Sequence, residues 1–380
     1  MSIRIFIGAD IVPTDTNFET FSSGHIESLV DNKISDVLSH GDYRVFNLEV
    51  PLVDKKAPIK KCGPNLIAPA DTVNGIKGVN PTLLTIANNH IMDHGQQGLE
   101  STLKVLKESN IDYIGSGNDI YEAQNPYVFS KDCKTVGVYA CCEHEFSIAD
   151  EDKPGANPFD PLESLDHISA LKSKCDYVIV LYHGGKEHYR YPSPLLQKVC
   201  RKMCDKGADL VVCQHSHCIG CEEKYNSSVI VYGQGNFLFD HSESEFWKTS
   251  LLIDAEFGDE MKINYVPLCK NGNGVRMATE EESTEIINAF NNRGEQIKVK
   301  GFIEEEYARF AEKMSNSYIN ALRNNGLIYK IIYKLSLGKY KQKYTEKNLL
   351  KMLNTFECEA HRELFITWLK DNAKRGKESE

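Results

Sequence analysis

The sequence predicts an α/β fold, because short runs of β-branched and aromatic residues alternate with segments of helical periodicity between Gly- and Pro-bearing loops. Helices are expected at residues 98–109, 162–172 and 194–206. Ligands in such folds bind beyond the carboxyl ends of the strands. Five expected strands end on polar residues: 3–9 before Asp10, 43–48 before Glu49, 83–87 before Asn88-Asn89-His90, 177–182 before His183, and 210–213 before Gln214-His215-Ser216-His217.

Composition limits the function of the chain. Its 380 residues, 41% of them hydrophobic and 26% charged, can bury one large core or two modest ones. The formal net charge of -10 argues against a protein that binds the phosphate backbone of nucleic acids, since such proteins present positive faces. We therefore expect no nucleic acid among the partners.

The N-terminal residues lack the apolar stretch of a secretory signal, and no run approaches the roughly 18 apolar residues that a transmembrane helix needs. A cytoplasmic location is therefore expected. The 12 cysteines lie mostly inside apolar stretches, which in this setting predicts reduced core thiols rather than a disulfide framework.

The pattern changes in the last third of the chain. Closely spaced strands at 228–232, 249–257 and 261–268 predict a second sheet or an edge hairpin. Helical periodicity with few β-formers then follows at 280–292, 304–323 and 348–370. We expect a boundary near residue 275, which divides the chain into 1–275 and a helical C-terminal extension, 276–380.

The residues at the strand ends are of the types that hold metal ions. Any one of them alone is more often a helix cap or a hydrogen-bonding loop residue, but five strand ends that each supply such a group predict a metal site. Mixed oxygen and nitrogen ligands without thiolate favour Mn, Fe or Zn. Two of the histidines are only two residues apart, so a turn must follow their strand for both to converge. The candidates are Asp10, Glu49, Asn89, His90, His183, His215 and His217.

Short motifs recur in a fixed order along residues 3–257. They are Asn47-Leu48-Glu49, Ala87-Asn88-Asn89-His90 followed by Asp93 and Gly95, His183-Gly184-Gly185 followed by Glu187, Gly207-Ala208-Asp209, His215-Ser216-His217, and Gly235-Asn236-Phe237 with Asp240. Each motif alone is weak, but the ordered set is specific. It resembles the CapA family, named for capsule or poly-γ-glutamate synthesis and related to the calcineurin-like metallophosphoesterases.

The resemblance implies a four-layer αββα sandwich of the metallophosphoesterase type, with two β-sheets flanked by helices and two divalent metal ions, Mn, Fe or Zn, at the strand ends. The catalytic pair would be His90, which protonates the leaving group, and Asp93, which orients its imidazole. The implied metal ligands are Asp10, Glu49, Asn89, His183, His215 and His217, with Glu49 the bridging one. Supporting or substrate contacts are implied for Asn47, Asn88, Glu187, Asn236 and Asp240, although a plain turn explains the last two equally well.

The implied function is that of a metal-dependent phosphoester hydrolase of capsule polysaccharide or poly-γ-glutamate synthesis, acting on a phosphorylated or anionic polymer-related substrate. The alternative is a non-catalytic assembly component that binds a metal or an anionic polymer. Two departures bear on this choice. Val12 replaces a usual histidine, which leaves one metal subsite poorer in ligands, and Gly184 replaces a common tryptophan, which removes an aromatic wall of the pocket.

Two further patterns have a chemical and a structural interpretation. Cys213, Cys218 and Cys221 surround the paired histidines like half a zinc knuckle or a redox pair, but without a second Cys-x-x-Cys core thiols explain them better. Residues 323–351 hold eight Lys or Arg against one acid, interleaved with apolar residues and tyrosines. Such a segment can lie on the inner face of an anionic membrane, although an ordinary packed surface helix is favoured.

Overall fold

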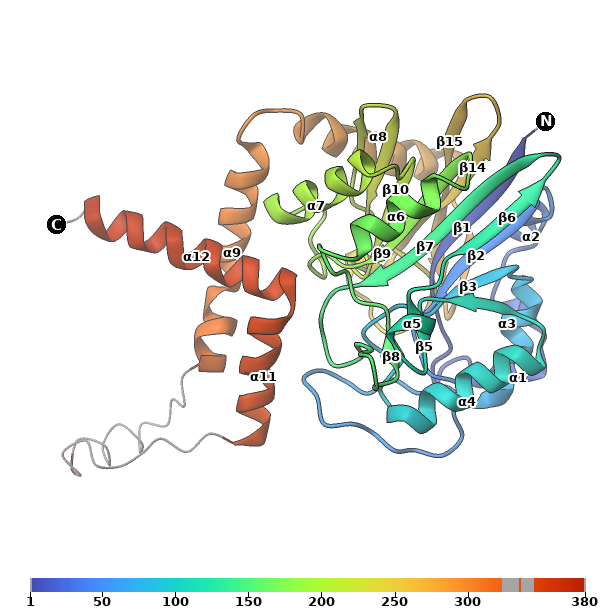
Figure 1. The fold of residues 1–380 in the computed structure, drawn as a ribbon, viewed down its shortest axis with the longest axis horizontal. Coiled ribbons are helices and arrows are strands. Elements are labelled where there is room, and N and C mark those ends of the chain that lie inside the picture. Colours follow the sequence, from blue (N-terminus) through green and yellow to red (C-terminus); the bar gives the residue numbers. More distant parts are fainter. Residues whose placement is uncertain (1, 323–334, 336–344, 379–380) are drawn as a thin grey trace.

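The computed structural model describes residues 2–322, 335 and 345–378 (Figure 1). Its larger sheet has eight strands in the order β16-β15-β14-β1-β2-β3-β4, with β13 paired to β1. These strands are β1 (Ile3–Val12), β2 (Tyr43–Leu48), β3 (Leu83–Thr85), β4 (Asp112–Ile114), β13 (Asn236–Phe239), β14 (Thr249–Phe257), β15 (Met261–Asn271) and β16 (Gly274–Met277). The neighbours β13, β1, β2, β3 and β4 run parallel, so their carboxyl ends share one edge.

A second sheet has six strands in the order β11-β12-β10-β9-β7-β6. They are β6 (Tyr127–Lys131), β7 (Lys134–Cys142), β9 (Tyr177–His183), β10 (Leu210–Gln214), β11 (Glu222–Tyr225) and β12 (Ser228–Tyr232). Strands β5 (Ser116–Gly117) and β8 (Gly155–Ala156) form a separate pair. Strands β7, β9, β10 and β12 are parallel, which gives this sheet a common carboxyl edge as well.

The two sheets pack face to face, and helices cover their outer faces (Figure 1). Residue alternation along β1 shows why: Ile3, Ile5 and Ile7 point into the core between the sheets, while Phe6 points into the core under the helices. Helices α1 (Phe18–Ser23), α2 (Asn32–Ser39), α3 (Val73–Val79) and α4 (Gly95–Glu108) cover the larger sheet, and α6 (Ser164–Lys172) and α7 (Pro194–Asp205) cover the smaller one. The short α5 (Ile120–Ala123) lies beside β5 and β8.

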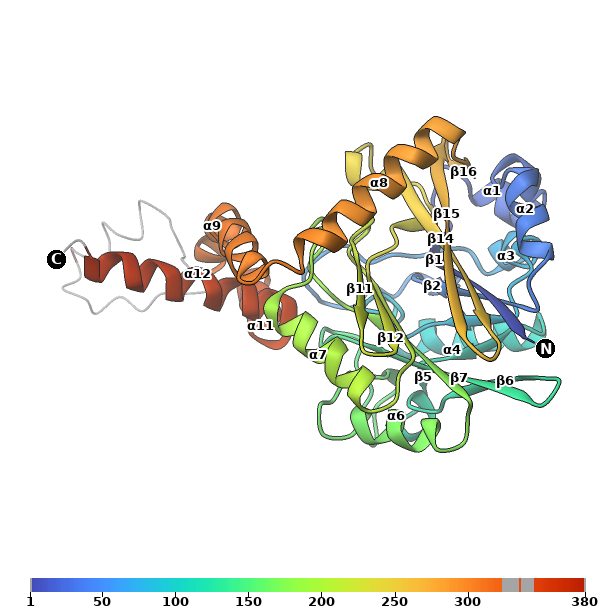
Figure 2. The ribbon, with the colours of Figure 1, turned by 90° about the horizontal axis from the view of Figure 1, so that it is seen from above.

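The chain beyond β16 is helical where it is described. Helix α8 (Glu280–Gln296) begins with a capping box of Thr279 and Glu282 and lies across one edge of the sandwich, against β15 and β11 (Figure 2). Helices α9 (Phe302–Leu322), α11 (Glu346–Glu357) and α12 (Glu359–Glu378) stand at one end of the sandwich, on the left in Figure 1. Their shared core includes Tyr307, Leu364 and Phe365, together with Tyr189 of the sandwich.

The predicted four-layer α/β sandwich with C-terminal helices is therefore confirmed. The expected strands at 249–268 form the β14–β15 hairpin at one side of the larger sheet, whereas β12 joins the smaller one. One helix prediction is wrong: residues 348–370 are not continuous, because Cys358 is extended (φ -66°, ψ 125°) and separates α11 from α12. The boundary between 1–275 and 276–380 stays a prediction. Most of segment 323–351, for which a packed surface helix is favoured over a membrane contact, lies outside the described residues.

Within the part of the chain that the structure describes, no helix combines the length and the apolar character that crossing a bilayer requires. All twelve cysteines are free thiols.

Candidate metal centre and active site

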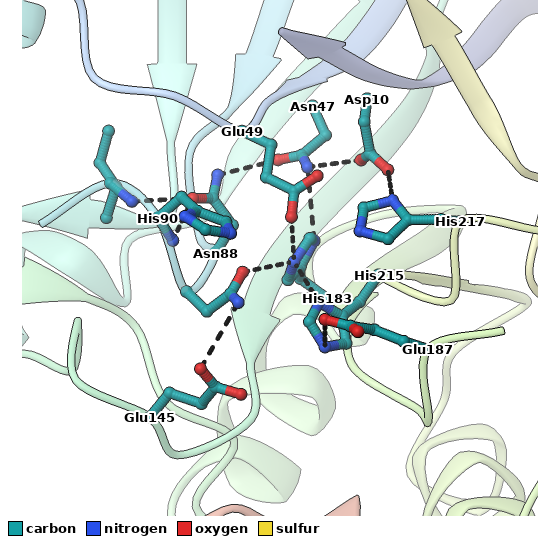
Figure 3. Close-up of polar contacts among 12 residues, drawn as sticks. Asp10, Asn47, Glu49, Asn88, His90, Glu145, His183, Glu187, His215 and His217 are labelled. Atoms are coloured by element: carbon teal, nitrogen blue, oxygen red, sulfur yellow. Dashed lines mark hydrogen bonds and ion pairs between the residues drawn. The ribbon is translucent and has the colours of Figure 1, made fainter. Parts of the chain in front are cut away.

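Strand register brings the predicted site residues together from distant parts of the chain. Asp10 of β1 lies opposite Asn47 of β2 on one side and Asn236 of β13 on the other. In the second sheet, His183 at the end of β9 lies opposite Gln214 of β10, so His215 follows directly. Figure 3 shows the side chains from the two sheets pointing toward one another. This convergence is what the strand-end pattern predicts.

Two buried carboxylates in this site have oxygen atoms without a hydrogen-bond donor among the described residues. Glu49 and Asp10 have no exposed surface, and among the described residues neither oxygen of Glu49, nor Oδ2 of Asp10, has a hydrogen-bond partner. Oδ1 of Asp10 accepts a hydrogen bond of 2.7 Å from Nδ2 of Asn47. An unpaired buried carboxylate costs several kcal/mol, so these oxygens fit a bound cation.

The imidazoles complete the set of donor atoms. Nε2 of His183 lies 3.0 Å from Nδ1 of His215, 3.1 Å from Oδ1 of Asn89 and 3.2 Å from Oε1 of Glu49. One ring nitrogen carries at most one proton and cannot satisfy three acceptors, whereas a divalent cation can. Ligand atoms of Glu49, His215 and His217 all lie within 4.8 Å of one another. The chain therefore contains a candidate metal-binding cluster at the predicted place.

The expected turn after β10 is present. His215 and His217 both have positive φ, 87° and 52°, a conformation that non-glycine residues rarely adopt. It directs both side chains of the i, i+2 pair into the site, where Nδ1 of His217 lies 2.9 Å from Oδ1 of Asn236 and 3.6 Å from Oδ2 of Asp10. Such backbone strain clusters at functional sites.

Burial and mutual charge set the protonation of the metal-free site. Burial, reinforced by the charge of Glu49, raises the pKa of Asp10. Burial alone would also raise the pKa of Glu49, but the imidazoles of His183 and His217 bring it well below its usual range. Burial opposes the charging of His217, yet Glu49 and Asp10 raise its pKa to about 10. Burial and the neighbouring His183 hold the pKa of His215 well below 6.5, so His215 is a neutral ring with a lone pair for a ligand.

His90 and Asp93 form a separate pair at the edge of this site. Nδ1 of His90 lies 2.6 Å from Oδ2 of Asp93, which also accepts a hydrogen bond of 2.6 Å from the backbone N–H of Leu66. The other oxygen of Asp93 is paired with Lys61, whose Nζ lies 3.3 Å from Nδ1 of His90. The side chain of Lys61 is only 2% exposed. A positioned imidazole held by a buried carboxylate is the arrangement that proton transfer requires.

The supporting residues occupy different places. Oδ1 of Asn88 accepts hydrogen bonds from the backbone N–H groups of His90 and Ile91, and its Nδ2 donates to Leu48 O, so it shapes the turn that presents His90. Glu187 lies near the ligands, with Oε1 3.9 Å from Nε2 of His215. Asp240 is paired with Lys270 and Thr16 instead, and among the described residues it contacts none of the predicted ligands.

Several residues of the site have no signal in the sequence. Lys61 lies in a loop with a second lysine and looks like solvated charge. Glu145 lies 3.5 Å from Nδ2 of Asn89, three residues after β7. Trp247 stacks on His217 with ring centroids 4.7 Å apart, so the site has an aromatic wall although Gly184 predicted none. Cys213, Cys218 and Cys221 are buried and belong to neither metal-ligand cluster found among the described residues.

The carboxyl edges of the two facing sheets bring candidate oxygen and nitrogen ligands together, so the chain is an α/β protein with a candidate metal site between its sheets. The chain belongs to the bacterial capsule synthesis protein PGA_cap family, whose model matches residues 5–241. All the predicted site residues fall inside this range.

The chain is similar to two capsule or PGA biosynthesis proteins and, in fold, to a solved phosphatase structure. Capsule biosynthesis protein CapA of Bacillus anthracis is 32% identical over 235 residues, which cover 60% of this chain and 57% of that protein. PGA biosynthesis protein CapA of Bacillus subtilis strain 168 is 31% identical over 230 residues, 57% of this chain and 60% of that protein. The matches thus span less than two thirds of either relative. A solved structure of a novel phosphatase from Mycoplasma pneumoniae covers 71% of this chain and 95% of its own, with 14% identity and a TM-score of 0.44.

Proposed function

We propose that this protein is a metal-dependent phosphoester hydrolase that acts on a phosphorylated or anionic polymer-related substrate in the synthesis of capsule polysaccharide or poly-γ-glutamate. The observation that carries the proposal is the buried Glu49 carboxylate, without a hydrogen-bond donor among the described residues, beside imidazoles from the second sheet. The similarity to a capsule biosynthesis protein and a PGA biosynthesis protein supports a role in the synthesis of such a polymer.

Six residues would hold the metal ions: Asp10, Glu49, Asn89, His183, His215 and His217. Their mixed carboxylate, amide and imidazole atoms suit Mn, Fe or Zn. Two bound divalent cations would neutralise phosphate charge and lower the pKa of the attacking water. The carboxylates of Asp10 and Glu49 are fully buried, which strengthens their attraction for a cation.

The His90–Asp93 pair would handle the proton of the leaving group. Because Nδ1 of His90 faces Asp93 at 2.6 Å, its other nitrogen, Nε2, is the atom that would donate a proton to the departing alkoxide. Asp93 fixes the ring orientation and compensates the positive charge of the imidazolium. Lys61, in turn, holds Asp93 in place through a buried ion pair.

The test combines metal content with turnover. Purified protein is analysed by elemental mass spectrometry and assayed with a generic aryl phosphodiester and monoester in the presence of Mn. We expect near two metals per chain at the strand-end site, and a fall in kcat of about 10²- to 10⁴-fold in His90→Ala with metal content and folding unchanged. One metal or none, without turnover, would contradict hydrolysis and favour the non-catalytic assembly component.

Location and membrane contact are part of the same proposal. We place the protein in the cytoplasm, with a peripheral contact at the inner membrane face through residues 323–351. Charge reversal at Lys330, Lys334 and Lys341 should abolish pelleting with anionic vesicles. Unchanged pelleting, or none in the parent protein, removes this part of the proposal.

A further inference from the structure

A second cluster of metal-ligand atoms lies where the C-terminal helices meet the sandwich. Glu145, Cys358 and His361 each offer one ligand atom, and these atoms all lie within 4.8 Å of one another. We propose that a divalent ion of the zinc class binds this cluster and links α12 to the sandwich. The site is distinct from the strand-end site and does not depend on the hydrolase proposal.

The donor set favours zinc. A thiolate, an imidazole and a carboxylate form a mixed set that zinc accepts, whereas the strand-end site has no sulfur. Sγ of Cys358 is fully buried and lies 3.5 Å from Oε2 of Glu143. With Zn–S of about 2.3 Å and Zn–O of about 2.0 Å, two ligands of a tetrahedral ion lie about 3.5 Å apart. Glu143, whose other oxygen accepts a 2.9 Å hydrogen bond from Gly185 N–H, lies beside the thiol but is not one of the three clustered residues.

The local backbone places two of these ligands together. Cys358 is the extended residue between α11 and α12, and His361 lies three residues later in the first turn of α12. Residues three apart at a helix start share one face. Nδ1 of His361 lies 2.9 Å from Oη of Tyr318 in α9. Metal-binding histidines use one ring nitrogen for such a contact, which fixes the ring and leaves the other nitrogen, here Nε2, for the ion.

Lys186 provides the competing explanation. Burial disfavours its charge, but Glu187, Tyr318, Cys358 and Glu145 raise its pKa, so its ammonium can be the counter-charge of the cluster. In that arrangement Cys358 stays a protonated thiol that donates to Glu143. A bound ion instead requires the Cys358 thiolate. Thiolate coordination therefore distinguishes the two explanations.

A bound ion would also connect the helices to the strand-end site. Oε2 of Glu145 lies 3.5 Å from Nδ2 of Asn89, a candidate ligand there. The preceding residue, His144, contacts Glu359 of α12: the backbone N–H of His144 donates to Glu359 at 2.9 Å, and Nδ1 of His144 lies 2.6 Å from Glu359. The same short loop therefore faces α12 with His144 and Asn89 with Glu145.

The experiment is a Co²⁺ titration of the full-length protein, followed by the near-ultraviolet charge-transfer absorption of a Co²⁺–thiolate bond. Because the strand-end site has no cysteine, Co²⁺ bound there gives no such band. We expect a band in the parent protein whose final intensity corresponds to one thiolate-bound Co²⁺ per chain and which Zn²⁺ displaces. Cys358→Ser should lose it and His361→Gln should weaken it, whereas Cys200→Ser, which changes another fully buried thiol, should keep it.

Absence of the band in the parent protein, or its persistence in Cys358→Ser, would overturn the proposal and leave Lys186 as the counter-charge. Circular dichroism checks that each variant folds. If Cys358→Ser does not fold, X-ray absorption of the zinc-loaded parent decides, since a sulfur at about 2.3 Å supports the site and an all-oxygen and nitrogen shell refutes it. Failure of the hydrolase proposal is recognised by other measurements: absence of turnover in the parent protein, and equal metal content in the parent and in Asp10→Asn.

Discussion

The fold positions the candidate metal-binding side chains of the strand-end site and of the Glu145–Cys358–His361 cluster in different ways. Asp10, His183 and their partners come from strands of two sheets, so strand register fixes their positions. Two of the three residues of the second cluster come from one helix start, beyond the residues 5–241 that match the family. The residues of the first site therefore lie inside the part of the chain that matches the family. The second site depends on how α12 packs against the loop that contains Glu145.

The largest effect is expected from Glu49→Gln. The variant should bind no more than a remnant of the strand-end metal and lose hydrolysis, because Glu49 is the candidate bridging ligand. The variant without metal should be less stable than the parent without metal, because Glu49 is a counter-charge of the buried His183 and His217 imidazoles. Thermal melting with and without Mn²⁺ measures metal binding: the parent should gain about 2.7 kcal/mol for each ion bound at the strand-end site at a metal concentration of about 100 Kd, and the variant almost nothing.

This variant also separates the two sites. The Co²⁺–thiolate band should persist in Glu49→Gln, because Glu49 belongs to the strand-end cluster alone. Equal metal binding by the variant and the parent would show that Glu49 is not a ligand. Loss of the thiolate band together with the strand-end metal would show that the two clusters fold as one unit.

A smaller effect is expected from Lys61→Met. Loss of Lys61 removes the partner of Asp93 and a cation 3.3 Å from His90. We expect kcat to fall about 10- to 100-fold with metal content unchanged, because Asp93 then loses the partner that holds it against His90. Stability should drop by roughly 3 kcal/mol, as for a broken buried ion pair.

The neighbouring residue provides a matched control. Lys60 pairs with Glu346 at 2.7 Å, but both side chains are mostly exposed, 76% and 63%. Lys60→Met should therefore change stability by less than about 1 kcal/mol and leave kcat unchanged. An unchanged kcat in Lys61→Met would limit Lys61 to a structural role.

The same contrast explains what the sequence could predict. Asp10 and His183 were predictable because each lies at or near the carboxyl end of a strand, and parallel strands bring these ends to one edge. Lys61 and Trp247 were not, because each reaches the site from a loop or short turn whose path is set by tertiary packing. The break between α11 and α12 at Cys358 was missed because helical periodicity continues on both sides of it. The contact that Cys358 makes there is with Glu143, which is far away in the sequence.

The smallest effect concerns the docking of α12 and its dependence on pH. The hydrogen bond to Glu359 raises the pKa of His144 above 6.5 despite burial. Burial would raise the pKa of Glu359, but His144 lowers it below 4.5. The stability from His144 is fully present below about pH 6.5 and lost as pH rises through its folded pKa, whereas that from Glu359 is present above about pH 4.5 and lost on acidification. The pair therefore stabilises α12 most between these values.

Glu359→Gln should remove this pH-dependent contribution. Because the His144 side chain is 38% exposed, we expect a loss of at most about 1 kcal/mol near pH 6 that shrinks toward pH 9, measured by denaturant unfolding of parent and variant. At one fixed pH, the variant should also bind Co²⁺ more weakly at Cys358, whereas its strand-end metal content should match that of the parent. Equal weakening at both sites would show that the helical extension supports the strand-end site as well, and the contrast between the two regions would fail.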